Sequence, residues 1–277
     1  MQRRFSKLSC VVLFLIVSTC LKAFPETMLQ PRRLVDSHTA GVIPRAHFDF
    51  ECRVYPAGNP EYGSGILLGM AVGISDRFML GLSYGGEGWV GRGRNAIANP
   101  LPGWLIKYRV FEESYAFPGV AIGYDHQGYG GLAEKAGFGY KGYIFKSPGF
   151  FLSLSKNYLV FSKAQLGLHG MINYSMEEYK TVTWPNCYAG IDFGINEELY
   201  FVMEYNMGFN QKDPDPPNRA LYARINEGYL NLGIRWAFSP SFNIEFDAKD
   251  VFENRRRLNG STLGWGRELK LVYIASF

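Results

Sequence analysis

Charge, cysteine and long apolar runs are scarce in this chain. Charged residues make up 19% of its 277 residues, below the roughly 25% of a typical soluble domain. Beyond Cys20, no uninterrupted apolar stretch reaches the roughly 20 residues of a membrane-crossing helix, which excludes a helical anchor. There are four cysteines, no metal-ligand spacing, and no basic stripe interleaved with stacking aromatics. The sequence therefore predicts no cofactor, no metal site, no catalytic residue, no enzyme activity and no nucleic-acid partner.

Aromatic residues and glycine are abundant instead. The chain has 18 Tyr, 21 Phe and 32 Gly. Low charge combined with these residues suits a β-barrel that has aromatic girdles and small side chains in its lumen. Some soluble all-β proteins share this composition, so the decision rests on the residue pattern.

The amino terminus has the layout of a secretory signal peptide. A basic stretch, residues 1–7, precedes the apolar run Leu8 to Val17, and cleavage is expected after Ala23. We therefore predict a signal peptide over 1–23, a periplasmic N-terminal segment over 24–46, and a barrel over 47–277. Two points stay open: whether Cys20 is lipidated, and whether 24–46 plugs the lumen or lies free in the periplasm. Cys52 and Cys187 are expected on lipid-facing strand positions, as small apolar side chains or as a disulfide.

A two-residue alternation returns along the chain from His47 onward. Phe48, Phe50 and Cys52, for example, alternate with polar neighbours. Such a strand has one face in an apolar medium and one in a polar medium. The pattern predicts strands over 47–55, 66–74, 78–85, 104–110, 120–125, 148–156, 160–174, 188–195, 199–209, 229–238, 242–249 and 268–277. The strand at 148–156 could also begin upstream, at Tyr143.

The connections between these strands alternate in length. Short ones are expected at 75–77, 112–117, 157–159, 196–198 and 239–241. Long ones are expected at 56–64, 87–102, 126–141, 175–186, 210–226 and 251–264. Short periplasmic turns with long outer loops are typical of outer-membrane barrels. We predict an all-β fold, a transmembrane antiparallel up-and-down β-barrel of about 12 strands, in the bacterial outer membrane with both termini on the periplasmic side.

The polar face of these strands carries ionised groups, which sets the orientation of the barrel. Apolar side chains from alternate positions would struggle to fill the wide interior of a soluble barrel this large. A charge facing lipid costs roughly 2–4 kcal/mol at mid-depth, and the apolar face has almost none. We therefore expect the apolar face outward and, as candidate lumen lining, Glu51, Arg53, Lys107, Arg109, Asp192, Glu204, Arg235, Glu245 and Asp247. They could form a selectivity lining or a paired network that partly fills the lumen.

Two outer loops are basic, through Arg92, Arg94, Arg255, Arg256 and Arg257. Guanidinium groups bind phosphates and carboxylates through charge-assisted hydrogen bonds. These residues are candidate contacts to the anions of lipopolysaccharide or an acidic polysaccharide; solvated loops on an anionic surface are the alternative. Gly86 to Gly91 matches the dinucleotide pattern G-x-G-x-x-G, but loop residues follow it instead of a helix.

The last strand, Glu268 to Phe277, resembles the final strand of bacterial outer-membrane β-barrels. Leu269, Leu271, Tyr273, Ala275 and Phe277 form its apolar face. The resemblance implies pairing of this strand with the first strand and contact with the barrel-assembly machinery through the strand that ends at Phe277. Outer-membrane lipid and lipopolysaccharide are the other expected partners, and the oligomeric state stays open.

A second resemblance is carried by residues 39–44 (Thr-Ala-Gly-Val-Ile-Pro), 53–56 (Arg-Val-Tyr-Pro), 76–86 and 118–125. These motifs are distantly similar to those of the exopolysaccharide-associated YjbH-like proteins. The likeness covers about a third of the chain and marks turns, so no functional residue is carried over. We expect a narrow channel or export-associated barrel for small solutes or polysaccharide. The alternative is an occluded structural barrel whose basic outer loops contact glycans or lipid headgroups.

Overall fold

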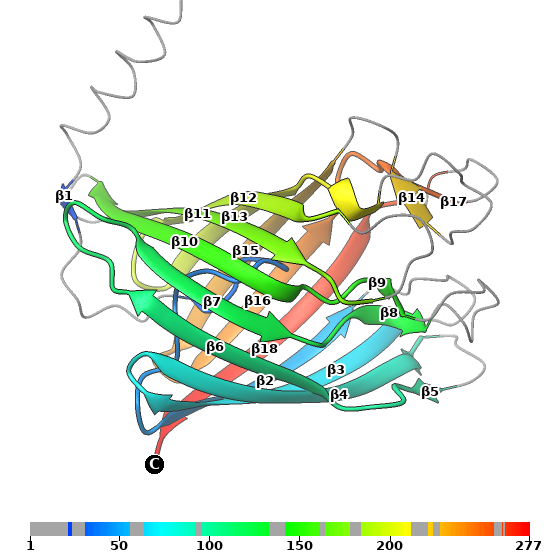
Figure 1. The fold of residues 1–277 in the computed structure, drawn as a ribbon, viewed down its shortest axis with the longest axis horizontal. Helices are drawn as coiled ribbons and strands as arrows, with labels where there is room; N and C mark the ends of the chain where they lie inside the picture. The colour runs from blue at the N-terminus through cyan, green and yellow to red at the C-terminus, as the bar shows by residue number, and fades with distance from the viewer. Residues whose placement is uncertain are drawn as a thin grey trace, which may run out of the picture.

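A closed antiparallel barrel forms most of the molecule (Figure 1). The computed structural model describes residues 22–23, 31–55, 64–91, 96–132, 142–160, 164–177, 184–211, 221–223, 228–257, 262 and 264–277. Its main sheet has 14 strands, of which β1 and β5 are two-residue strands at the rims and the other twelve form the barrel. These twelve are β2 (His47–Tyr55), β3 (Ser64–Ser75), β4 (Phe78–Val90), β6 (Gly103–Phe111), β7 (Gly119–Asp125), β10 (Gly149–Val160), β11 (Ala164–Tyr174), β12 (Asn186–Gly194), β13 (Leu199–Asn206), β15 (Tyr229–Ser239), β16 (Phe242–Lys249) and β18 (Gly266–Ser276).

Each barrel strand pairs with the next one in the chain, and the last closes on the first. β18 pairs with β2 from Leu269↔Val54 to Ser276↔His47, and β7 pairs with β10. The predicted twelve-stranded up-and-down barrel, with its first and last strands paired, is confirmed. The expected signal peptide lies outside the described residues, apart from Lys22–Ala23. These two residues form β1, beside Tyr158 and Leu159 of β10.

The remaining elements gather at the end of the barrel that carries the long loops (Figure 1). They are β5 (Ile97–Ala98), β8 (Tyr129–Leu132) with β9 (Tyr143–Phe145), the short 3-10 helix η2 (Phe209–Gln211), and β14 (Leu221–Ala223) with β17 (Arg255–Arg257). The chain's carboxyl end lies at the opposite end, among the short turns. We call these the long-loop end and the short-turn end.

Several strand boundaries differ from the prediction: β4 runs on to Val90, into the loop expected at 87–102, and β13 ends at Asn206 instead of 209. The turn expected at 157–159 is wrong, because Asn157 and Leu159 pair with Gly167 and Gln165 inside the β10–β11 ladder. Asn157 resembles a turn residue in sequence, yet its side chain is buried and accepts a hydrogen bond from the Gln165 amide at 3.3 Å. Tyr143 begins the separate strand β9 and does not extend β10 upstream.

The apolar face of the barrel points outward and the ionic face points inward, as predicted. Leu82 is 62% exposed and Phe246 is 60% exposed, whereas Lys107 and Glu204 are fully buried. The two described cysteines, Cys52 and Cys187, are free thiols, so the disulfide alternative does not apply. Among the described residues, no helix has the length and apolar character needed to cross a membrane.

Replacing Ile234 with Arg is expected to cost roughly 2–4 kcal/mol of folding free energy, since a cation would face lipid at mid-depth. Ile234 is outward at the middle of β15 and 47% exposed. Phe238→Arg, on the same face at the short-turn end of that strand, should cost only about 0–1 kcal/mol. Urea titration of the protein folded into lipid vesicles measures both changes. Equal costs would contradict the lipid-facing assignment of β15.

Residues 31–46 enter the lumen and fold back on themselves; we call this segment the lumen hairpin. Its tip is a tight turn in which the Leu34 N–H donates to the Ser37 carbonyl at 2.9 Å, and Arg33 and His38 form an antiparallel bridge. In Figure 1 the hairpin is the dark blue trace inside the barrel. For 24–46 the sequence left a plug and a free periplasmic segment open. Of its described part, residues 31–44 lie inside the lumen, and Arg45 is exposed at the short-turn end, where its N–H donates to Asp76 at 3.1 Å.

Apolar side chains on the inward face complete the packing around the hairpin. Val42 and Ile43 of the hairpin form one buried cluster with Ala71, Met79, Leu105, Phe151 and Met171 of the wall. Leu34 and Val35 at the tip pack against Val202 of β13. The lumen at this depth is thus a packed core rather than a water-filled channel.

Candidate functional site in the barrel lumen

Most of the predicted lining residues lie in the lumen. The buried ones are Glu51, Arg53, Lys107, Asp192, Glu204, Glu245 and Asp247. Arg235 is partly buried and pairs with Glu245. Arg109 is at the short-turn end, where its guanidinium donates to the Asp76 carbonyl at 2.7 Å. The structure adds lining residues outside the predicted set: Asp49, Asp125, Asn231, Lys249, Glu268 and Lys270 of the wall, and Tyr129 of the outer-loop strand β8.

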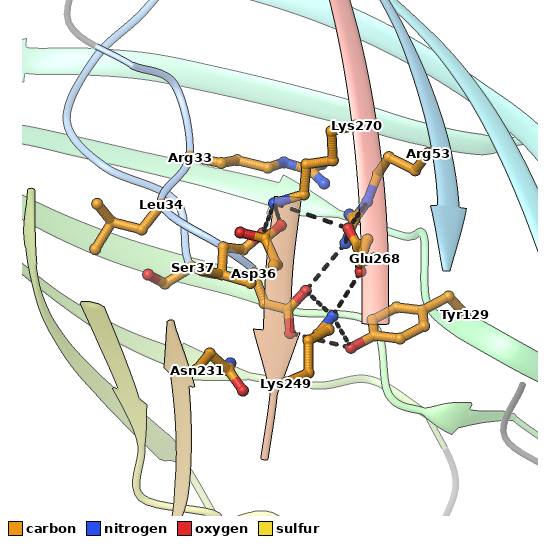
Figure 2. Close-up of polar contacts among 12 residues, drawn as sticks. Arg33, Leu34, Asp36, Ser37, Arg53, Tyr129, Asn231, Lys249, Glu268 and Lys270 are labelled. Atoms are coloured by element: carbon orange, nitrogen blue, oxygen red, sulfur yellow. Dashed lines mark hydrogen bonds and ion pairs between the residues drawn. The ribbon is translucent and has the colours of Figure 1, made fainter. Parts of the chain in front are cut away.

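The carboxylate of Asp36, at the tip of the hairpin, is held by three groups of the barrel (Figure 2). The Lys249 ammonium lies 2.6 Å from it, the Arg53 guanidinium 3.0 Å, and the Tyr129 hydroxyl donates to it at 3.0 Å. Glu268 accepts from the same two cations, at 3.0 Å from Lys249 and 2.7 Å from Arg53. Burial opposes ionisation of Asp36, but the charges of Lys249 and Arg53 keep its pKa below the usual range. Asp36 is therefore an anion at neutral pH.

Glu204 of β13 binds the other side of the tip. One of its oxygens accepts from the backbone N–H groups of Asp36 at 3.0 Å and Ser37 at 2.8 Å, and from the Ser37 hydroxyl at 2.7 Å. Its second oxygen accepts from the Asn231 amide at 2.9 Å. Lys270 donates to the Val35 carbonyl at 2.8 Å. The tip is thus bound through its side chains and through its backbone.

Two arginines tie the rising arm of the hairpin, which precedes the tip, to acidic wall residues. Arg32 contacts Asp49 and lies 2.8 Å from Glu51. Arg33 lies 2.6 Å from Asp125, which also lies 2.9 Å from the His38 ring. The hairpin therefore supplies cations where the wall is acidic and an anion where the wall is basic. This complementarity makes it a fitted plug.

Ser155, His169 and Asp192 form a hydrogen-bonded chain on the wall. The Ser155 hydroxyl lies 2.8 Å from His169 Nδ1, and His169 Nε2 lies 2.7 Å from Asp192. The same residue types serve as nucleophile, base and orienting acid in hydrolases. Here Ser155 is 1% exposed, and its oxygen accepts the N–H of Ala40 at 2.8 Å. This hydrogen-bonded set therefore ties the descending arm of the hairpin, which follows the tip and contains Ala40, to β10, β11 and β12.

Two inward glycines make room for the hairpin. A Cβ at Gly73 of β3 would stand 2.0 Å from the Pro44 carbonyl oxygen and 2.4 Å from that of Ile43. A Cβ at Gly190 of β12 would stand 2.3 Å from Leu34. At Gly73 the close atoms belong to the hairpin backbone, so this wall position must be glycine for the hairpin to fit. At Gly190 the closest atom is the terminal methyl of Leu34, which would have to change its conformation.

A cavity of about 350 Å³ remains between the hairpin and the wall. Both charge signs line it, with Arg32, Arg235, Glu51 and Glu245 among the lining residues. Glu197 and Pro240 belong to short connections and also line it, so the cavity lies toward the short-turn end. The plugged lumen thus keeps a vestibule at the end opposite the long loops.

The predicted outer-loop anion contacts are only partly described, and Arg255 is a correction. Arg255 is 4% exposed, with its guanidinium 4.5 Å from the ring centres of both Phe145 and Tyr229. It stacks inside the loop cluster and does not present its charge to an external anion. Arg92 and Arg94 lie outside the described residues, as do the side chains of Arg256 and Arg257. Within the described chain, no group of His, Cys, Asp and Glu is placed to hold a metal ion.

Glu177 links the outer loops and predicts a pH dependence there. It accepts backbone N–H groups of Tyr143 at 2.7 Å and Ser147 at 2.5 Å. Burial raises its pKa to about 7, although these donors act in the opposite direction. Because the folded pKa is raised above the ordinary value of 4.5, the stabilisation is complete below about pH 4.5 and is lost as pH rises through about 7.

We therefore expect hydrogen-exchange protection of the Tyr143 and Ser147 amides to fall between about pH 4.5 and 7, after correction for intrinsic exchange. Glu177→Gln should remove this dependence, because the amide does not titrate. Protection that is flat with pH in the unsubstituted protein would contradict the prediction.

The closed barrel, its apolar outer belt and its ionic interior define a transmembrane β-barrel of the outer-membrane type.

No protein-family model matches the chain, and no curated protein matches it. Among solved structures, the KdgM porin is similar at 9% identity, with 83% of this chain and 99% of that chain covered and a TM-score of 0.43. An outer membrane channel from Pseudomonas putida F1 is similar at 11% identity, with 87% and 100% covered and a TM-score of 0.41. A bacterial polysaccharide outer membrane secretin is similar at 10% identity, with 85% and 99% covered and a TM-score of 0.41.

Proposed function

We propose that the protein is an outer-membrane channel for small solutes whose resting state is closed by the lumen hairpin. One observation carries the proposal: the lumen is filled by a separate segment of chain and not by side chains of the wall alone. Residues 31–44 precede β2 and form no ladder with any barrel strand; backbone hydrogen bonds to β3 begin at Ala46, whose N–H donates to the Gly73 carbonyl at 3.2 Å. They can therefore leave the lumen while every ladder of the barrel stays intact.

The nature of the contacts supports a displaceable plug. Its tip and its rising arm are bound mainly through ion pairs and hydrogen bonds, such as Asp36 with Lys249 and Arg33 with Asp125. In water these groups can exchange their partners for solvent, so the net free energy that holds them in place is far smaller than the number of contacts suggests. The vestibule of about 350 Å³ lies beside the hairpin at the short-turn end, the end at which the segment joins β2.

A disulfide across the hairpin tests the proposal. A Cβ built at Gly119 of β7 lies 3.3 Å from the Cβ of Ala40, close to the roughly 3.5–4.5 Å found in disulfides. Ala40→Cys with Gly119→Cys, in a Cys52→Ala and Cys187→Ala background, would lock the descending arm to the wall. Single-channel recording in planar bilayers should show openings in the reduced protein and none in the oxidised protein. The Cys52→Ala and Cys187→Ala background without the new pair is the matched control, and its channel openings should be the same before and after oxidation.

Equal conductance of the oxidised and reduced proteins would overturn the gating proposal. Absence of conductance in every form, including a variant lacking residues 31–44, would favour the second candidate, an occluded structural barrel.

The second candidate has one observation in its favour: Val42 and Ile43 belong to the buried apolar cluster of the barrel. Export of polysaccharide, contact with lipopolysaccharide, and delivery by the barrel-assembly machinery through Phe277 remain proposals of the sequence.

A further inference from the structure

We infer that the barrel wall beneath the hairpin tip is a binding site for a small carboxylate-bearing solute, and that Asp36 occupies it as a built-in competitor. The inference rests on the proposed function, because the solute gains the site only when the hairpin leaves. The contacting atoms of Asp36 stand for the carboxylate of that solute. The tip thus shows how the wall would hold such a group.

The half of the site that the wall and the outer-loop strand β8 supply is prebuilt and buried. Arg53 is 3% exposed, Lys249 is fully buried and Tyr129 is 9% exposed. The Lys249 ammonium lies 4.1 Å from the centre of the Tyr129 ring, and the Arg53 guanidinium lies 5.4 Å from it. Cation–π contacts of this kind fix both charges in place. Two fixed cations and one hydroxyl converge on a single carboxylate.

The two cations lose a close partner when Asp36 is absent. The Asp36 carboxylate lies 2.6 Å from Lys249 and 3.0 Å from Arg53. The wall carboxylates that stay beside them are Glu268, which they share, and Glu51 at 3.9 Å from Arg53. Breaking a buried ion pair from one side is costly, and a carboxylate from solution would replace the lost partner.

The neighbouring wall narrows the chemical class of the solute. Glu204 accepts two backbone N–H groups and one hydroxyl from residues 36–37, so a ligand in the same place must bring hydrogen-bond donors beside its carboxylate. A hydroxylated acid, such as a uronic acid, satisfies both requirements. A neutral sugar lacks the charge, and acetate lacks the donors.

The rest of the lumen confines such an anion to the tip site. Where Arg32 and Arg33 withdraw, the wall that they leave carries Asp49, Glu51 and Asp125. These carboxylates repel an anion. The solute is therefore held where Asp36 was, and its expected effect is to keep the hairpin displaced.

The test uses the full barrel in detergent with Asp36→Ala, which empties the carboxylate position. Calorimetry at constant ionic strength should show D-glucuronate binding to Asp36→Ala about tenfold or more tightly than to the unsubstituted protein, acetate binding more weakly, and glucose not binding. A tenfold change corresponds to about 1.4 kcal/mol. Asp36→Asn fills the same space without charge and is the control for the cavity. Adding Lys249→Met to Asp36→Ala should abolish binding.

A second measurement needs no variant. In planar bilayers, glucuronate should raise the open probability of the unsubstituted protein several-fold over equimolar glucose with added chloride. If Asp36→Ala binds glucuronate no better than glucose, or binds it equally well without Lys249, the inference is overturned even where the disulfide experiment succeeds. If the reduced disulfide variant never opens and Asp36→Ala does not bind glucuronate, the gating proposal fails and the inference that rests on it fails with it.

Discussion

Replacing Lys249 with Met is expected to lower the free energy of unfolding of the barrel by about 3–5 kcal/mol, the cost of breaking a buried ion pair from one side. The Lys249 ammonium is fully buried and contacts Asp36, Glu268 and the Tyr129 hydroxyl. Methionine has a similar length but no charge, so both carboxylates lose a partner in a place that water does not reach. Equilibrium urea unfolding in lipid vesicles measures the change.

An exposed ion pair of the same barrel supplies the control. Arg77 lies 3.0 Å from Glu112 at the short-turn end, and their side chains are 51% and 47% exposed. Arg77→Met should change stability by about 0–1 kcal/mol, because water screens the pair and solvates the remaining charge. If Lys249→Met costs no more than Arg77→Met, the tip of the hairpin does not sit in the lumen as described.

The second large effect is expected from Gly73→Ala, which should shift the lumen hairpin toward the displaced state and raise the mean conductance of the barrel by about tenfold or more, since strain on the closed state changes the open–closed equilibrium about tenfold per 1.4 kcal/mol. The added methyl group would meet the backbone of Ile43 and Pro44 at 2.0–2.4 Å, and backbone atoms cannot rotate away as a side chain can. Overpacking of this kind costs roughly 1–3 kcal/mol, which the hairpin relieves by leaving. Single-channel recording measures the result.

Gly69→Ala is the matched control, on the same strand and the same inward face. A Cβ at Gly69 meets no atom closer than 3.8 Å, which is ordinary contact. Its conductance should equal that of the unsubstituted protein. An equal rise in both variants would assign the effect to the glycines of the wall rather than to the hairpin.

Local sequence signals anticipated part of the candidate site and missed the rest. Glu51 and Arg53 were identified as lining because side chains two apart on a strand share a face. A different signal in the sequence indicates the hairpin. Met79, Leu105 and Met171 occupy inward positions, where apolar side chains would be unfavourable in a water-filled lumen. These residues pack against Val42 and Ile43. An inward apolar position in a charged lumen therefore indicates a covering segment.

For Arg255 the sequence predicted an exposed charge, and the structure buries it. In sequence it belongs to a run of three arginines in an outer loop, where a solvated charge is the ordinary expectation. In the structure it lies between Phe145 and Tyr229, which are 110 and 26 residues earlier in the chain. Only the packing of the loops on one another brings these rings to the two faces of its guanidinium.

The sequence by itself determined the number of barrel strands, their approximate positions and which face meets lipid, because the alternation of side chains along a strand is a local property that each strand displays alone. The tertiary structure decided what fills the lumen. Asp36 and Lys249 are 213 residues apart, and Arg33 and Asp125 are 92 apart. No local pattern encodes such pairings, since a charge on an inward face can be satisfied by water, by a neighbouring strand or by a plug. Closure of the barrel around residues 31–46 selects the plug, because it excludes the water and leaves those partners within reach.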